Sequence, residues 1–158
     1  MASKPKIQIV DDPELRNTIE GNTERLNQIE LAKWAISVAK HVLPYLEHEF
    51  PQNEKILDGI KINELWQTQE ASVYQVRQAG FKVHEVAREC KEETARAAAR
   101  AVGQAIGVGH MRGHAMVAVD YAIKTINLAF NNDLKRAREE REWQLHKLYT
   151  FIPDEKFK

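Results

Sequence analysis

Cysteine is nearly absent from this sequence, because Cys90 is the only one among 158 residues. A single thiol excludes an intrachain disulfide and a zinc site built on several cysteines, and it favours a reducing compartment. No histidine and asparagine accompany Cys90 at a recognisable catalytic spacing. We therefore interpret Cys90 as a structural thiol.

Long apolar runs are also absent. No run of about 18 apolar residues, the length that can cross a bilayer, occurs in the chain. Residues 1–6 lack the apolar core of a signal peptide. We therefore expect a cytoplasmic protein with no membrane association.

The sequence has no excess of charge of one sign. Lys and Arg number 23, as do Asp and Glu, so the formal net charge is zero. A nucleic-acid-binding protein usually carries a basic excess or a basic stripe. The nearest approach to a stripe is a set of four basic residues diluted by acidic neighbours: Lys135, Arg136, Arg138 and Arg141. We interpret this segment as a solvated helix face and expect no nucleic-acid partner.

What the sequence has in quantity is helical periodicity. Apolar residues recur at helical spacing through residues 31–46, and Pro44 interrupts them. Because the proline ring crowds the carbonyl of Lys40, we expect a bend there and not an end. Similar patterns predict a helix from 13 to about 20 that Gly21 and Asn22 end, a helix over 110–130 and a last helix over about 133–149.

These patterns predict an all-α fold, a single-domain bundle of about six helices with a Pro-bent helix and a central Ala/Gly-rich helix. Residues 1–11 are expected to form an extended N-terminal arm, because their apolar run has no partner strand. The helical domain then covers residues 12–153. Residues 154–158 are expected to form a loose tail after Pro153.

A ridge of small residues runs along the Ala/Gly-rich segment. Ala95, Ala99, Gly103 and Gly107 are four residues apart and stack on one face of a helix. A ridge without side-chain bulk allows a second helix to approach closely. We favour a contact inside the bundle, and a homodimer is the alternative.

Two histidines follow the ridge within residues 109–115. His110 and His114 stand one helical turn apart if the segment is helical, which is how helices present imidazoles to a metal ion. Zinc needs a third protein ligand, however, and the spacing selects none from His41, Glu47, His48, His84 or Asp120. We favour a polar pair that packs or lines a groove, and we predict no cofactor. A smaller possibility is an anion held at a helix N-terminus beside His110 and Arg112.

The three tryptophans, Trp34, Trp66 and Trp143, fall at inward positions of different helices and are expected to anchor the core. No serine or cysteine nucleophile stands in a catalytic context, so we expect no enzyme. The alternative is a small metal-binding protein or enzyme centred on His110 and His114.

Several segments, taken in order, carry a resemblance to a known family: 31–35, 42–47, Trp66, 71–73, 95–103, 109–115 and 142–144, with Pro153 after them. Together the segments cover roughly residues 30–153. On them the chain resembles a bacterial immunity protein family, the Imm-five-like group of polymorphic-toxin systems. The residues that match its motifs, or that line a groove, are Trp34, Trp66, His110, Arg112, His114 and Trp143.

The resemblance implies an all-helical cytosolic protein that protects its producer by binding a cognate protein toxin. Such a protein occludes its partner through shape and charge complementarity, so it needs no catalytic group. This is our leading hypothesis.

Overall fold

The computed structural model describes residues 2–152, and within them the chain forms eight α-helices and no strand. The helices are α1 (Pro13–Thr23), α2 (Gln28–Val42), α3 (Pro44–Glu47), α4 (Glu54–Gln67), α5 (Val73–Glu89), α6 (Glu93–Gly107), α7 (His114–Ala129) and α8 (Leu134–Tyr149). The all-α prediction is confirmed. The expected tail at 154–158 and its preceding Pro153 lie outside the described residues.

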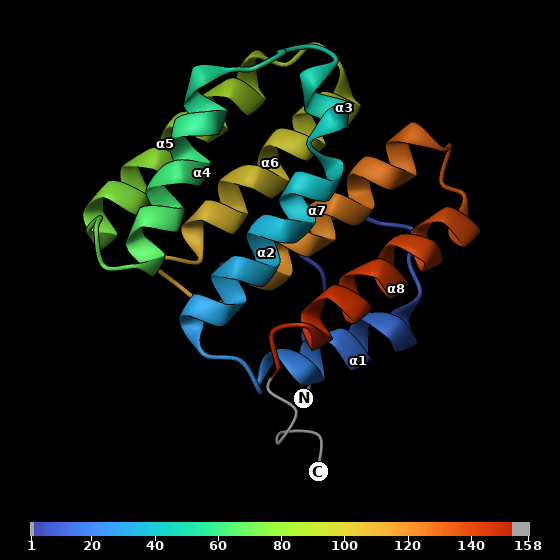
Figure 1. Cartoon of the computed structure of the whole chain (residues 1–158). Helices are drawn as coiled ribbons and strands as arrows, with labels where there is room; N and C mark the ends of the chain where they lie inside the picture. The colour runs from blue at the N-terminus through green and yellow to red at the C-terminus, as the bar shows by residue number, and fades with distance from the viewer. Residues whose placement is uncertain (1, 153–158) are drawn as a thin grey trace.

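Helix α6 is the centre of the bundle (Figure 1). It packs against α5 on one side and α7 on the other, and α2, α3 and α4 also contact it. The alanines of α6 are buried on every side of the helix. A helix with so little side-chain volume can have neighbours all round it, because backbones approach each other closely only where bulk is absent.

The count of about six helices is wrong, partly because of Pro44. Helix α2 ends at Val42, and Pro44 begins the separate one-turn helix α3. The N–H of Leu43 donates a hydrogen bond of 3.3 Å to the backbone oxygen of Lys40, three residues earlier. The last turn of α2 is therefore tighter than an α-helical turn. Proline has no N–H to continue the ladder, and its fixed φ suits the first position of a new helix. The predicted bend is therefore a break.

Two predicted helix boundaries also differ from the structure. Helix α1 continues through Gly21 and Asn22 to Thr23. Residues 108–113 form turns, and α7 begins only at His114. The N–H groups of His110 and Met111 both bond to the oxygen of Gly107, which closes the end of α6. His110 and His114 therefore do not share a helix.

Local capping signals position several helix starts. A capping box begins α5, because Ser72 and Gln75 exchange side-chain and backbone hydrogen bonds there. Asp12 caps α1 and Asn53 caps α4 in the same way, each through a side-chain oxygen that accepts from a backbone N–H of the first turn. Such caps satisfy N–H groups that the first turn leaves unpaired.

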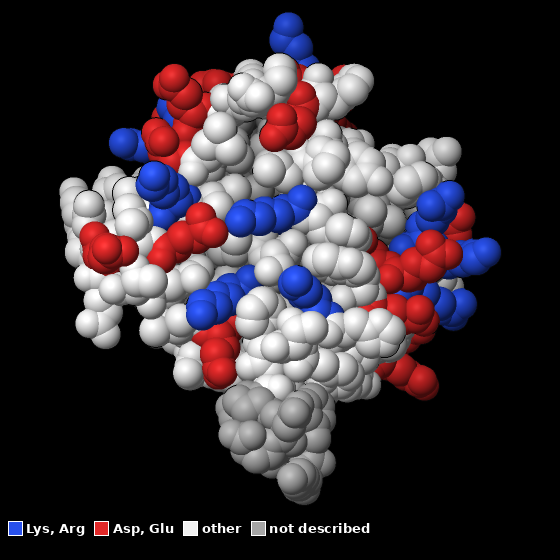
Figure 2. Space-filling model, viewed as in Figure 1, with Lys and Arg blue, Asp and Glu red and all other residues white. Residues whose placement is uncertain are grey.

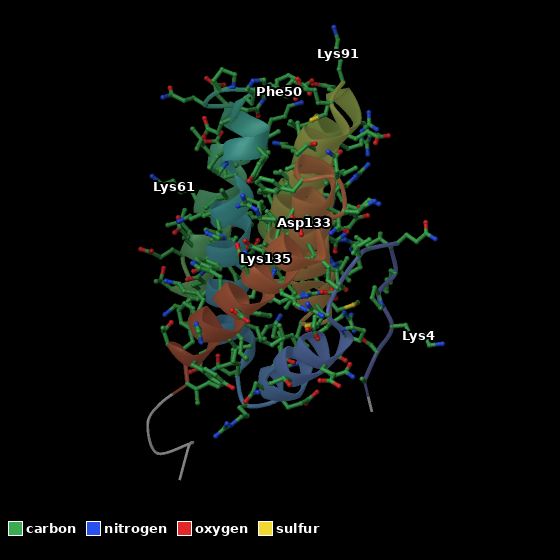
Figure 3. The ribbon with its side chains drawn as sticks, turned by 90° about the vertical axis from the view of Figure 1, so that its right-hand side faces the viewer. Lys4, Phe50, Lys61, Lys91, Asp133 and Lys135 are labelled. Carbon is green, nitrogen blue, oxygen red and sulfur yellow. The ribbon has the colours of Figure 1, made fainter. Side chains whose placement is uncertain are left out.

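Residues 2–12 lie along the bundle without helical structure (Figure 3). The backbone of Val10 exchanges two hydrogen bonds with the side chain of Asn127 on α7, at 2.8 and 2.9 Å. Lys124 of α7 donates to the oxygen of Gln8. Farther toward the N-terminus, Lys4 points away from the body of the protein (Figure 3). The expected arm thus packs against α7 through side-chain contacts.

A buried ion network joins this arm to α1, α7 and α8. Both oxygens of Asp120 accept from Arg16 at 2.9 Å, and one also accepts from Arg141 at 2.7 Å. Arg141 in turn makes a two-point pair with Asp11, and its remaining nitrogen donates to Gln144. The Arg141 side chain is 0% exposed. The prediction of a solvated helix face is therefore wrong at Arg141, because this residue lies on the side of α8 that faces the core.

Candidate functional site

The two motif histidines meet although they lie on different elements. The ring centroids of His110 and His114 are 4.8 Å apart, with the rings at 63°. The Nδ1 of His114 lies 2.6 Å from Oε1 of Gln104 on α6. Because that oxygen can only accept, the Nδ1 of His114 carries the proton.

The ring of His114 occupies the space above Gly107. A methyl group at Gly107 would lie 3.1 Å from Cγ of His114, which is tighter than ordinary contact. Burial lowers the pKa of His114, and the neighbouring His110 lowers it further. A neutral imidazole packed on a glycine explains why this end of the ridge has no side chain.

A third histidine, His84 of α5, packs on the ridge one turn earlier. A methyl group at Gly103 would lie only 2.6 Å from Cε1 of His84. Arg100 of α6 donates from Nη1 to Nδ1 of His84 at 2.9 Å. Burial lowers the pKa of His84 to about 4, and the charges of Arg100 and Arg88 act in the same direction. His84 is therefore neutral at pH 7, with its proton on Nε2.

Sequence reasoning gave His84 no special role. The signal that could have identified it is its place on α5, beside the apolar face that packs on α6. The bare ridge at Gly103 leaves room there for a ring. Ala95 and Ala99 are also fully buried, so the whole ridge is inside the described chain and offers no surface to a second copy.

The low pKa of His84 makes the fold sensitive to acid. The unfolded chain takes up a proton near pH 6.5, and folded His84 does so only near pH 4. The free energy of unfolding therefore falls as the pH drops through this window. We expect His84→Gln to reduce that slope in urea unfolding measured between pH 7 and pH 4. His48→Gln, at an exposed position, should keep the wild-type slope, and equal slopes in all three proteins would contradict this role of His84.

His84 lines a cleft between α5, α6 and α7 with a volume of about 500 Å³. The other lining residues are Phe81, Glu85, Arg88, Arg100, Gln104 and Tyr121. Glu85 is the acidic member, and it pairs with Lys55 of α4 at 3.2 Å. The cleft is thus predominantly basic and polar.

Among residues 2–152, no group of three or more His, Cys, Asp or Glu side chains is arranged to hold a metal ion. Two of the residues considered as a third ligand are engaged elsewhere. His41 lies 2.9 Å from Glu140 and stacks on Trp143, and Asp120 holds two arginines.

Arg112 does not face an anion site beside His110. Its Nη2 donates to the backbone oxygens of Thr23 and Leu26, at 3.2 and 3.3 Å, where α1 ends. Helix C-termini leave carbonyl oxygens unpaired, and a cation near them is favourable. Arg112 thus fastens the loop before α7 to the end of α1.

The three tryptophans lie on three different helices, α2, α4 and α8. Trp34 is fully buried in α2, and its Nε1 donates to the backbone oxygen of Gln144 at 2.9 Å. Trp143 and Trp66 are only partly buried against the core. Trp143 stacks on His41 with ring centroids 3.7 Å apart. The sequence predicts that all three tryptophans anchor the core, and of the three only Trp34 is fully buried in it.

The outer face of α5 exposes large apolar side chains. Tyr74 is 69% exposed, Val73 52% and Phe81 48%. These three residues define the α5 face. Beside it, α4 and α5 enclose a groove of about 690 Å³ whose lining includes Ile62 and Leu65. Helices α4 and α5 lie together along one edge of the bundle (Figure 1).

Charges are mixed over the front of the molecule. Figure 2 shows Lys and Arg interspersed with Asp and Glu, with no field of one sign across that view. Within residues 2–152, no helix combines the length and the apolar character that crossing a bilayer requires.

The chain is similar to a known protein family. A family model described as Imm-5 like putative immunity protein matches residues 21–151. No curated protein and no solved structure matches the chain. The matched region begins within α1 and includes α2–α8, the histidine motif and the α5 face. Because the match covers most of the sequence, the chain belongs to the Imm-5 like putative immunity protein family.

Proposed function

We propose that this chain is an immunity protein that binds a cognate toxin domain through the α5 face and neutralises it without catalysis, in the cytoplasm of the bacterium that makes it. The family supports the immunity role in general terms. The observation that carries the choice of surface is the exposure of Val73, Tyr74 and Phe81 along one helix.

Large apolar side chains that are exposed together on one helix are typical of a protein-interaction site. Tyrosine dominates the binding energy of many protein interfaces, because its large ring is rigid and its hydroxyl remains polar. Arg77 lies with its guanidinium 5.6 Å from the ring centroid of Phe81, and arginine is also enriched at interfaces. The α5 face therefore has the composition of a binding surface.

The α5 face is also rigid. The capping box at Ser72 fixes the first turn, which carries Val73 and Tyr74. The opposite side of the helix is buried through Val76, Val83 and neighbouring small residues. A preorganised helix loses little conformational entropy on binding, so more of its contact energy becomes affinity.

The rim of the adjoining groove supplies charges of both signs. Lys61 and Lys82 line it together with Glu54 and Asp58. An apolar centre with a charged rim is the usual anatomy of a specific interface. Such a rim selects among partners through electrostatic complementarity.

The test is a protection experiment. The chain, immobilised, captures its partner from a lysate of the source bacterium, and the captured toxin domain is then co-expressed with each variant in a sensitive host. Wild type should restore growth. The double variant Tyr74→Ala/Phe81→Ala should fail to do so and should bind about 100-fold more weakly.

Met111→Ala is the matched control, because Met111 is an equally exposed apolar residue on the loop before α7. It should protect as well as wild type. Full protection by the α5 double variant would exclude the α5 face. Failure of the wild-type chain to protect against any captured protein would exclude the immunity role itself.

A further inference from the structure

The cleft between α5, α6 and α7 holds two cations without a counter-charge. Among residues 2–152, neither Arg88 nor Arg100 forms an ion pair with a carboxylate. The acidic residue at the cleft, Glu85, is paired with Lys55. Arg100 is partly buried, and its one hydrogen bond within the described chain goes to the neutral ring of His84. The positive potential in the cleft is therefore not cancelled locally.

Most of the polar groups in this cleft that do not form a hydrogen bond within the described chain are hydrogen-bond donors. Arg100 uses one of its five N–H donors on Nδ1 of His84. In that bond Nδ1 is the acceptor of His84, so the polar group of His84 that has no partner in the described chain is the donor Nε2–H. Gln104 gives its oxygen to His114, which leaves the amide nitrogen as a donor. Arg88 and the Tyr121 hydroxyl have no hydrogen-bond partner in the described part of the chain.

We propose that this cleft binds an anionic oxygen group, a phosphate or a carboxylate, between Arg88 and Arg100. Guanidinium groups bind both through paired N–H donors. His84, Gln104 and Tyr121 line the same cleft, and its volume of about 500 Å³ accommodates either group. Phe81 belongs both to the α5 face and to the lining of this cleft, so the two sites adjoin, but the proposal rests on the cations and donors of the cleft and not on toxin binding.

The site has a built-in reporter. The ring protons of His84 respond to a ligand beside Arg100, and an anion there favours the imidazolium and raises the pKa of His84 from about 4. Titrations with inorganic phosphate and with acetate, each against sodium chloride at equal ionic strength, measure this by NMR. We expect a saturable shift with a dissociation constant of about 1 mM for the preferred anion.

Arg88→Gln and Arg100→Gln should each weaken binding at least about tenfold, which is the loss of one charge-assisted contact. Lys82→Gln is the matched control, because Lys82 is also on α5 but lines the groove on the side of α4. It should bind like wild type. Because Arg88 is exposed, Arg88→Gln should fold like wild type, and it is the variant that tests the site if Arg100→Gln does not fold.

Preference for phosphate would identify a phosphate-bearing ligand, and preference for acetate would identify a carboxylate such as an acidic side chain. Either result supports the site. The absence of a saturable shift with both anions would overturn the proposal. So would equal binding by wild type and Arg88→Gln, because the response would then not arise in the cleft.

Discussion

Asp120→Ala is expected to lower the free energy of unfolding by about 3–5 kcal/mol, the cost of leaving buried cations without their counter-ion. Asp120 accepts hydrogen bonds from Arg16 and Arg141, whose side chains are 5% and 0% exposed. Without it, Arg141 keeps its pair with Asp11, and the carboxylate that Arg16 keeps in the described chain is only Glu20, 3.9 Å away. Water cannot take over the role of the lost carboxylate at such depth.

Urea unfolding and the melting temperature measure this effect, and a chain of this size should melt on the order of 10 °C lower. Asp58→Ala removes an exposed carboxylate from α4 and is the control. It should change stability by no more than about 0.5 kcal/mol. If the two variants were equally stable, the network would contribute nothing to the fold. Asp120→Asn keeps the shape and is the variant to measure if Asp120→Ala does not fold.

Trp34→Ala is expected to cost a similar amount, about 3–5 kcal/mol, for a different reason. The ring is fully buried between α2 and its neighbours, and its N–H bonds to the backbone of Gln144 on α8. Removing it leaves a cavity that a core built largely of alanine cannot fill by shifting side chains. The backbone oxygen of Gln144 also loses its donor.

The comparison that tests this interpretation is Trp143→Ala. Trp143 is only partly buried and stacks on the exposed ring of His41, so truncation leaves a surface notch that water can enter. We expect a clearly smaller loss of stability, measured by the same urea unfolding. Trp34→Phe should fall between wild type and Trp34→Ala, because it fills most of the space but lacks the N–H. Equal losses for Trp34→Ala and Trp143→Ala would contradict the burial argument.

The histidine motif shows where sequence reasoning reached its limit. The spacing of His110 and His114 placed the two rings together, and they are together. The helix predicted over 110–130 begins only at His114, because Gly107 and Gly109 flank a turn that ends α6, so it does not include His110. The more informative histidine, His84, lies 26 positions before His110 in the sequence and meets the ridge only through the packing of α5 on α6.

The basic residues near the C-terminus also show that burial depends on contacts between distant segments. Arg138 and Arg141 are three residues apart and look equivalent in the sequence. In the structure Arg138 is half-exposed and pairs with Asp12, and Arg141 is fully enclosed. The sequence contains no local signal of this difference, because the partners of Arg141 are Asp11 and Asp120 on other elements.

The sequence by itself determined the all-α class and the small-residue ridge, and it pointed to the family, because each of these depends on residues close together in the chain. The tertiary structure decided which arginine is buried, which histidine meets the ridge and which apolar side chains of α5 remain exposed. These depend on contacts between distant segments, and a side chain has no preference among them until the helices pack.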